Sequence, residues 1–214
     1  MCITDKLNKF ILLIDLMENN KLTEPSYSKE QRDVIDQIRE IYNFIRIKNF
    51  CNLIPEVRTN IAGALKDAKT KENVAGIDGR ITIVNGLPKA AGDVKFGVAE
   101  HTARLVLTAK EFDNSINFVI NLKFTPELIS NIRKKTDLQL EEIDREKQPK
   151  EIKNKEFSTM QWLIKESVDK IGRIPDIIWD TGSIGKEPMI RLFGKDATDL
   201  IKKLRKIINI NIDD

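Results

Sequence analysis

The sequence is poor in the residues that build zinc sites and disulfide frameworks. Its 214 residues include one histidine and two cysteines. One imidazole and two separated cysteines cannot supply the usual three protein ligands, which excludes a histidine zinc cluster and leaves an all-oxygen Mg²⁺ site open. Cys2 and Cys51 show no CxxC spacing. The cysteines therefore predict neither a disulfide framework nor a cysteine zinc site, and they fit a reducing cytoplasm.

Long hydrophobic runs are also missing. The most apolar early stretch, FILLIDLM at residues 10–17, contains Asp15, is too short to span a bilayer, and has no small-residue cleavage site beside it. Charge of one sign is equally scarce, because 36 Lys and Arg face 33 Asp and Glu, and the excess of +3 is spread along the chain. This balance disfavours nucleic acid as the main partner. We expect a soluble protein that does not insert into a membrane.

The N-terminal quarter has the periodicity of two helices. Apolar residues recur at helical spacing over residues 3–19. Ser28 and Gln31 form a capping-box pattern ahead of a second amphipathic stretch that ends near residue 49. We interpret residues 1–52 as a helical extension or linker, and residues 53–214 as the main domain.

From about residue 57 the pattern changes to short strands alternating with helices. It predicts strands at 80–84, 118–124, 138–143, 176–179 and 189–193, and helices at 101–112, 126–135, 160–171 and 197–207. Residues 144–156 read as a charged connection. The sequence therefore predicts one α/β domain behind the helical extension.

The single histidine lies in KFGVAEHTARLVLTA, residues 95–109. A helix starting near Ala99 places His101, Arg104 and Thr108 on one stripe, while an apolar stripe faces the core. His101 is thus expected on the polar side. From the residues alone, a structural role and a catalytic or phosphate-binding role both stay open.

Two further stretches could bind an anion. In DTGSIGKEPMIRL, residues 180–192, Gly182 and Gly185 flank Ser183 and precede Lys186, so a tight turn could present N–H groups and an ammonium to a phosphate. The spacing is not that of a Walker A loop, and a plain connecting loop is the alternative. In AGIDGRITIVNG, Arg80 follows a glycine turn at the head of a strand, where it is either an oxyanion clamp or a surface ion pair.

Four blocks occur in a fixed order along the chain. They are LIPEVRTNIAGALKDAKTKENVAGIDGRI, KFGVAEHTARLVL, DREKQP and PDIIWDTGSIGKEPMIRLFGKDA. Together they resemble the ThiN family, the thiamine-phosphate synthase domain that is often fused behind a hydroxymethylpyrimidine kinase. The resemblance covers about residues 53–207, and the GKEPMIR run makes it specific.

The resemblance implies a transferase reaction and a set of site residues. The diphosphate of hydroxymethylpyrimidine diphosphate leaves and the nitrogen of thiazole phosphate replaces it, giving thiamine phosphate and pyrophosphate. A loose transition state would need cations and N–H donors around the leaving group more than a nucleophile. The residues implied are Arg80 and His101 as catalytic groups, Arg104, Gly182, Ser183, Gly185 and Lys186 as substrate or phosphate ligands, and Asp180 and Glu187 as ligands of a Mg²⁺ ion.

The resemblance also implies a fold: the three-layer α/β/α arrangement of the class II aldolase, or AraD-like, proteins, with a largely antiparallel sheet. Aldolases of that fold use a histidine-bound zinc, for which this chain lacks the histidines. In the family a kinase domain often precedes this region, whereas here only the helical pair does. The chain is therefore a candidate for the C-terminal part of a longer fusion, and its oligomeric state stays open.

A second function comes from the same resemblance, because ThiN-like domains also serve as thiamine-phosphate-sensing domains in transcriptional regulators. Those regulators carry a helix-turn-helix ahead of the sensor. Here the two expected helices are long, and the connection between them, residues 20–27, has eight residues and includes Pro25. This pattern favours the synthase.

Overall fold

The computed structural model describes residues 26–149, 151–152 and 158–210. The chain divides into two compact units, Met1–Arg32 and Asp33–Asp214. The helix expected at residues 3–19 lies outside the described residues. In the first unit the predicted capping box is confirmed, since the Ser28 N–H donates to Gln31 Oε1 at 2.9 Å and the Gln31 N–H donates to Ser28 Oγ at 3.2 Å. These bonds cap helix α2, Lys29–Ile47.

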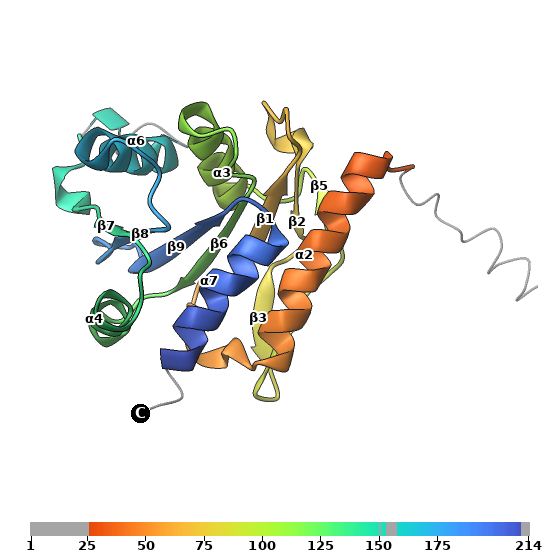
Figure 1. The fold of residues 1–214 in the computed structure, drawn as a ribbon, viewed down its shortest axis with the longest axis horizontal. Coiled ribbons are helices and arrows are strands. Elements are labelled where there is room, and N and C mark those ends of the chain that lie inside the picture. Colours follow the sequence, from red (N-terminus) through yellow and green to blue (C-terminus); the bar gives the residue numbers. More distant parts are fainter. Residues whose placement is uncertain (1–25, 150, 153–157, 211–214) are drawn as a thin grey trace, which may run out of the picture. The chain divides into compact units, whose positions relative to one another are not determined.

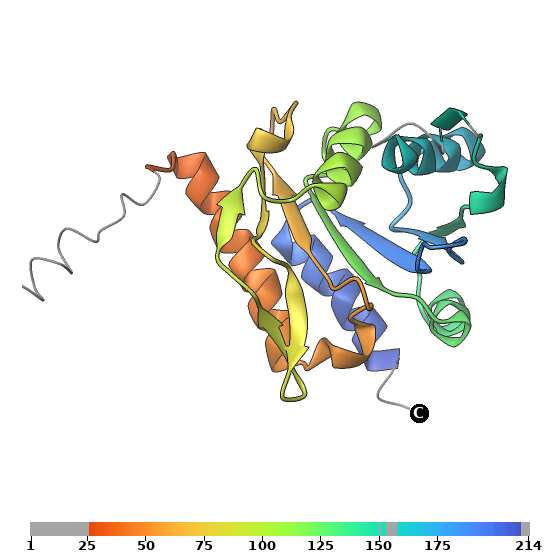
Figure 2. The same ribbon diagram turned by 180° about the vertical axis from the view of Figure 1, so that it is seen from behind.

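The second unit is built on a seven-stranded sheet in the order β5-β2-β1-β6-β9-β8-β7. Its strands, shown in Figures 1 and 2, are β1 (Ile61–Ala64), β2 (Val74–Ile77), β5 (Val94–Phe96), β6 (Phe118–Lys123), β7 (Leu140–Glu142), β8 (Ile177–Asp180) and β9 (Met189–Gly194). Neighbouring strands are antiparallel except β7 and β8, which are parallel. The expected α/β class with a largely antiparallel sheet is thus confirmed.

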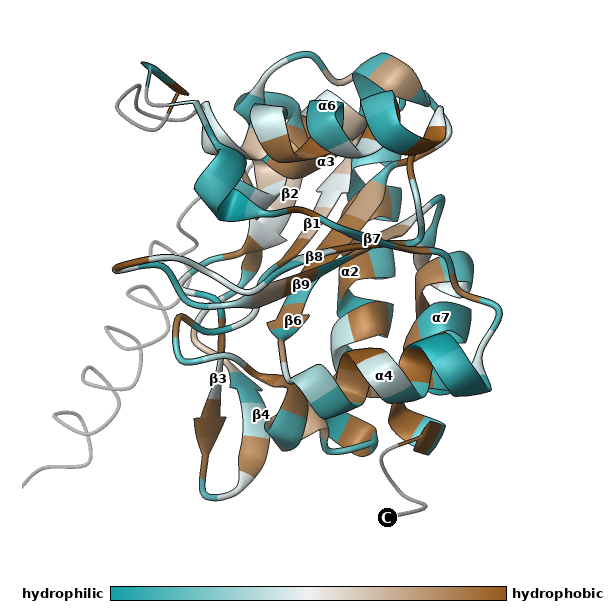
Figure 3. Cartoon of the chain, turned by 90° about the vertical axis from the view of Figure 1, so that its left-hand side faces the viewer, coloured by the Kyte–Doolittle hydropathy of each residue, from teal (hydrophilic) through white to brown (hydrophobic). Residues whose placement is uncertain are grey.

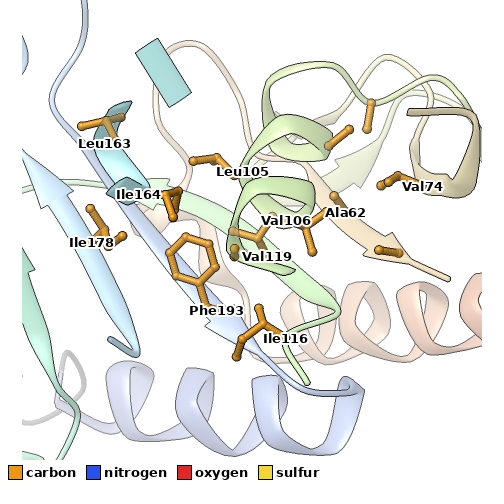
Figure 4. Packing of buried hydrophobic residues seen from close by; sticks show 14 of the residues in the cluster. Ala62, Val74, Leu105, Val106, Ile116, Val119, Leu163, Ile164, Ile178 and Phe193 are labelled. Carbon is orange, nitrogen blue, oxygen red and sulfur yellow. The ribbon is translucent and has the colours of Figure 1, made fainter. Parts of the chain in front are cut away.

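Helices cover both faces of this sheet. Because side chains alternate along a strand, neighbouring residues of β1 face opposite sides. Ala62 packs with α3 (His101–Phe112) and α6 (Thr159–Ile171) in one hydrophobic cluster, part of which Figure 4 shows. A Cβ at Gly63 would lie 2.9 Å from Val34 of α2, on the other side.

The second face carries α2 and α7 (Ala197–Ile210), which lie side by side. Their contact includes a hydrogen bond from the Ala197 N–H to Gln37 Oε1 and the guanidinium of Arg205 over the ring of Phe44. Helix α4 (Pro126–Lys135) follows β6 and begins at the N-cap Thr125. Figure 3 shows hydrophobic residues along the central strands and hydrophilic residues on the outward side of α7.

A separate two-stranded sheet joins β3 (Ile81–Val84) to β4 (Leu87–Ala90). The turn between them is Asn85–Gly86, and both residues have positive φ, 51° and 74°. This is the type I′ geometry that Asn-Gly favours in a two-residue hairpin. The expected strand at residues 80–84 is present, but it pairs within this hairpin and not within the main sheet.

The helices agree closely with the sequence-based prediction, and those at residues 101–112 and 126–135 match residue for residue. Strands β1, β2, β4 and β5 and the three short 3-10 helices, η1 (Phe50–Leu53), η2 (Lys71–Asn73) and η3 (Arg145–Lys147), were not predicted. Within the described ranges, no helix combines the length and apolar character needed to cross a membrane.

Candidate functional site

A pocket of about 1040 Å³ opens at one edge of the main sheet. Residues at the start of β1 and β9 and at the end of β2 and β6 line it, together with the first residues of α3 and α6. The antiparallel order explains this convergence, because a strand that ends at this edge lies beside one that begins there. Functional side chains from distant parts of the sequence are thereby brought to one place.

The pocket is strongly cationic. Six cationic side chains line it: Arg58, Arg80, Arg104, Arg145, Arg191 and Lys186. Three carboxylates line it as well: Glu56, Glu100 and Glu187. Cations in excess of carboxylates in a concave site raise the local concentration of anions. The pocket is thus suited to a ligand that carries several negative charges.

Two of the arginines are held by one buried carboxylate at the end of β8. Asp180 is fully buried, and its Oδ2 accepts a hydrogen bond from Arg191 Nη1 at 2.6 Å. Its Oδ1 lies 2.9 Å from Arg145 Nε and accepts a 2.8 Å hydrogen bond from the Gly182 N–H. Burial lowers the pKa of Arg191; Asp180 opposes this effect, and the charge of Arg145 adds to it. Asp180 thus offsets part of the repulsion between the two guanidiniums.

Arg80 is fixed by the backbone of the segment before β1. Its Nη1 donates to the Val57 carbonyl oxygen at 2.6 Å. That segment is anchored in turn by Glu187, whose two carboxylate oxygens accept from the N–H groups of Glu56 and Val57 at 2.9 and 3.0 Å. Arg58 and Arg80 both have positive φ, 70° and 72°. Such backbone strain is concentrated at functional sites, and here it affects two pocket arginines.

Two asparagines of the pocket, Asn60 and Asn121, join the strands that line it. The Asn60 N–H donates to Asn121 Oδ1, and Asn121 Nδ2 donates to the Arg58 carbonyl. The side chain of Asn60 also exchanges hydrogen bonds with both backbone groups of Ile77. These bonds link the start of β1 to β2 and β6. They fix the segment that carries Arg58 against the end of β2, which leads to Arg80.

His101 is the first residue of α3 and lines the same pocket as Arg80. Partial desolvation, together with the charges of Arg104, Arg80 and Arg191, lowers the pKa of His101, while Glu100 acts in the opposite direction. The first turn of α3 lines the pocket, so the positive end of the helix dipole lies at the pocket, and the N-cap Glu100 makes no side-chain capping bond there. The predicted convergence of His101 and Arg80 is present in the structure, and Arg104 lines the pocket with them.

The glycine loop places its residues differently. Gly185 and Lys186 line the pocket, whereas Gly182 and Ser183 are not among the lining residues. The N–H of Gly182 is bonded to Asp180, and the N–H groups of Ser183 and Lys186 are bonded to each other's carbonyl oxygens. These three N–H groups therefore serve the turn itself and not a phosphate. Gly182 is required there, since φ is +77° and a Cβ would lie 2.4 Å from the Lys186 oxygen.

The two carboxylates expected to bind Mg²⁺ are already engaged. Asp180 accepts hydrogen bonds from the Gly182 N–H and from Arg191, and it pairs with Arg145. Glu187 accepts hydrogen bonds from two backbone N–H groups. In the described part of the chain, no group of three or more His, Cys, Asp or Glu side chains is arranged to hold a metal ion. Neither carboxylate fits a Mg²⁺ ligand in this arrangement, because the oxygens that would coordinate the ion already contact N–H groups or guanidiniums.

Three pocket arginines were missed by the sequence-based reasoning. Arg145 lies in the charged stretch that was interpreted as a connection, yet it is only 7% exposed. Arg191 lies within β9 between Ile190 and Leu192, and a charged residue inside an apolar strand was a usable signal. Arg58 follows a proline-containing connection and offered no comparable pattern.

Comparison with known proteins identifies relatives of this chain. The family model described as "Thiamine-phosphate synthase ThiN" matches residues 37–206. The bifunctional thiamine biosynthesis protein ThiDN of Methanocaldococcus jannaschii is 37% identical over 190 residues, covering 88% of this chain. The chain spans 43% of the length of that relative.

Two further similarities extend over nearly all of the protein compared. The thiamine-phosphate synthase ThiN of Methanothermobacter thermautotrophicus is 33% identical, over 81% of this chain and 92% of that protein. A crystal structure of the C-terminal domain of a phosphomethylpyrimidine kinase superposes with a TM-score of 0.76 at 34% identity, covering 84% of this chain and 98% of that one.

Proposed function

Because the chain belongs to the thiamine-phosphate synthase ThiN family, we propose that it condenses hydroxymethylpyrimidine diphosphate with thiazole phosphate. The bond between the pyrimidine methylene carbon and the diphosphate oxygen breaks, and the thiazole nitrogen forms a new bond to that carbon. The products are thiamine phosphate and pyrophosphate, which makes the protein a transferase. The observation that carries the proposal is the convergence of five arginines, Lys186 and His101 on one pocket.

The pocket residues suit a reaction in which the leaving group takes up most of the charge. Electron release from the aminopyrimidine favours a loose, carbocation-like transition state, so negative charge grows on the departing diphosphate. Fixed cations and hydrogen-bond donors stabilise such charge without reorganising during the reaction. We assign this role to Arg80 and His101, and we assign binding of the substrate phosphates to Arg104 and Lys186.

The second requirement is to hold two substrates in contact. Positioning of reactants alone can supply a large part of a rate enhancement. Val98, Leu105 and Met160 line the pocket beside the charged groups and offer an apolar surface to a heterocycle. The pocket volume of about 1040 Å³ lies near the upper end of the range for small-molecule sites, roughly 300–1,000 Å³.

A magnesium ion, if bound, would be carried mainly by diphosphate oxygens. We propose Mg²⁺ in this form because such ions commonly bind phosphates and retain several water molecules. Asp180 and Glu187 do not suit direct coordination, for the reasons given above. No step of the proposed reaction is assigned to the ion.

Other features of the protein are also proposals. Helices on both faces of the sheet support a three-layer α/β/α fold of the class II aldolase type. The sparse cysteines support a cytoplasmic location. The bifunctional relative supports fusion to a kinase domain in a longer protein. Gel filtration of the purified chain tests self-association. Both curated relatives are named as biosynthetic proteins, which favours the synthase over the sensor.

The direct test is to incubate the purified chain with hydroxymethylpyrimidine diphosphate, thiazole phosphate and Mg²⁺. Thiamine phosphate and pyrophosphate should accumulate in equal amounts, and omission of either substrate should abolish the signal. No thiamine phosphate above a protein-free control would contradict the proposal. A parallel reaction with EDTA tests the metal, since unchanged turnover would argue against a role for Mg²⁺.

A further inference from the structure

The carboxylate of Asp180 lies behind two pocket arginines and not in the pocket. Asp180 is fully buried and is not among the lining residues, whereas Arg145 and Arg191 do line the pocket. The carboxylate contacts both guanidiniums, at 2.9 Å from Arg145 Nε and 2.6 Å from Arg191 Nη1. A group in this position can reach a pocket ligand only through the arginines.

The two arginines come from elements that are far apart in the sequence. Arg191 lies on β9 in the middle of the sheet, while Arg145 lies in the short 3-10 helix η3, Arg145–Lys147. Both side chains are more than nine-tenths buried, with exposures of 7% for Arg145 and 3% for Arg191. Two buried guanidiniums repel each other unless a counterion lies between them. Asp180 supplies that counterion at the end of β8.

One carboxylate does not neutralise two guanidiniums, so this cluster keeps a net positive charge at the pocket wall. A buried, uncompensated charge is unfavourable. An anion in the pocket would balance it, and the planar guanidinium fork is well suited to phosphate oxygens.

We propose that Asp180 is a positioning residue that aims Arg145 and Arg191 at the diphosphate group of the substrate. This inference rests on the proposed function, because it names the residue that arranges the anion site of that same pocket. Asp180 holds one nitrogen of each guanidinium and leaves the other nitrogens of the fork for the ligand. The bond from the Gly182 N–H to the same carboxylate fixes its own orientation.

Charge alone and positioning predict opposite effects for one substitution. Asp180→Asn removes a negative charge next to the anion site, so by charge alone pyrophosphate should bind more tightly. If Asp180 aims the arginines, the amide would release or repel them, and pyrophosphate should bind more weakly in spite of the added positive charge.

The experiment is calorimetric titration of pyrophosphate at constant ionic strength into wild type, Asp180→Asn, Asp180→Glu and Asp176→Asn, with thermal unfolding of each. Asp176 is the matched control because it also sits at one end of β8 and pairs with a cation, Lys203 at 2.8 Å, outside the pocket. Asp180→Glu keeps the charge while moving the carboxylate by one methylene, and its thermal unfolding shows whether the fully buried position accommodates the longer side chain.

We expect the Kd of pyrophosphate to rise about 10-fold or more in both Asp180 variants and to stay unchanged in Asp176→Asn, although all three lose thermal stability. In turnover assays kcat should fall by about 10²-fold, the loss typical of a disturbed transition-state donor. Adding Arg145→Gln to Asp180→Asn should weaken binding less than the same change does in wild type, because the two residues act together.

Wild-type or tighter pyrophosphate binding by the folded Asp180 variants would overturn the inference. If Asp180→Asn does not fold, Asp180→Glu alone decides between the two outcomes by the same criterion. Absence of pyrophosphate binding by the wild type would also overturn it. Failure of the proposed function is distinguishable, because wild type would then bind pyrophosphate in the Asp180-dependent way and yet form no thiamine phosphate.

Discussion

At the scale of single residues, Arg80 combines an unfavourable backbone conformation with a proposed catalytic side chain. A non-glycine residue at positive φ costs roughly 1 to 2 kcal/mol, and Arg80 is held there at 72° with its guanidinium bonded to Val57. Arg80→Gly should relieve the strain and leave the melting temperature unchanged or slightly higher, while kcat falls by about 10²-fold. Arg80→Ala should lower both.

Asn85→Gly is the matched control for that change. Asn85 also has positive φ, 51°, but lies in the β3–β4 turn outside the pocket. The control should change stability little, because Asn already suits this turn, and it should lose no turnover. Thermal unfolding and steady-state kinetics on all three variants decide the point. Full turnover in Arg80→Gly would show that the guanidinium is not needed.

His101 should make anion binding depend on pH. Its lowered pKa leaves the imidazole neutral in the free pocket at neutral pH, and a bound anion favours its protonation. Affinity for pyrophosphate should therefore rise as the pH falls, and this extra affinity should be lost as the pH rises through the pKa of the anion-bound imidazole. Titrations at several pH values compare wild type with His101→Ala, in which the ligand's own titration is the same.

The gap in log Kd between wild type and His101→Ala should widen toward acid pH. A gap that stays constant with pH would mean that the imidazole acts without gaining a proton. A structural role alone predicts a different result again: a lower melting temperature with binding and kcat nearly intact.

Part of the candidate site was singled out before the structure. His101 is the only histidine in the chain, Arg80 follows a glycine turn, and the family resemblance implied a role for both; the structure places both on one pocket. Arg145 was missed because the charged stretch around it is typical of a solvated connection. Nothing in that stretch indicates that Arg145 is buried and paired with Asp180. An ion pair between positions 35 residues apart is a property of the fold and not of either segment.

At the scale of elements, the close contact between α2 and β1 depends on Gly63. A Cβ there would lie 2.6 Å from Phe118 and 2.9 Å from Val34. Gly63→Ala should lower the free energy of unfolding by about 1 to 3 kcal/mol through overpacking, measured by urea denaturation. Combined with Val34→Ala, which makes room, the loss should be smaller than the sum of the two single losses. Additive losses would contradict this account of the contact.

The elements also show where sequence patterns work. Helices α3 and α4 were predicted to the residue because their apolar stripes are local, and α4 also has a local cap at Thr125. Strands β1 and β2, IAGA and VAGI, are buried at every position, so they lack the alternation that marks a half-exposed strand, and their glycines and alanines argue against one. Asn85–Gly86 is a sequence signal for a two-residue hairpin, and it indicates the pairing of β3 with β4 that was not predicted.

At the scale of the whole molecule, the boundary expected between residues 52 and 53 can be tested by truncation. Five residues of α2 are buried in the unit that begins at Asp33: Val34, Ile35, Ile38, Ile41 and Ile45. Burying one such side chain is worth roughly 1.5 to 3 kcal/mol, and whole domains are stable by only about 5 to 15 kcal/mol. A chain of residues 53–214 should therefore not unfold cooperatively, whereas residues 26–214 should. Cooperative unfolding of the shorter chain would support the earlier boundary.

The central claim is that the arginine-lined pocket carries out the synthase reaction. A second basic hollow, lined by Lys134, Lys135 and Lys206 at the ends of α4 and α7, provides the comparison. The decisive measurement is the rate of thiamine phosphate formation by wild type and by two variants that each lose one positive charge, Arg145→Gln and Lys134→Gln. We predict a loss of about 10²-fold or more in kcat for Arg145→Gln and a wild-type rate for Lys134→Gln. Equal rates in all three proteins, or a loss confined to Lys134→Gln, would contradict the account.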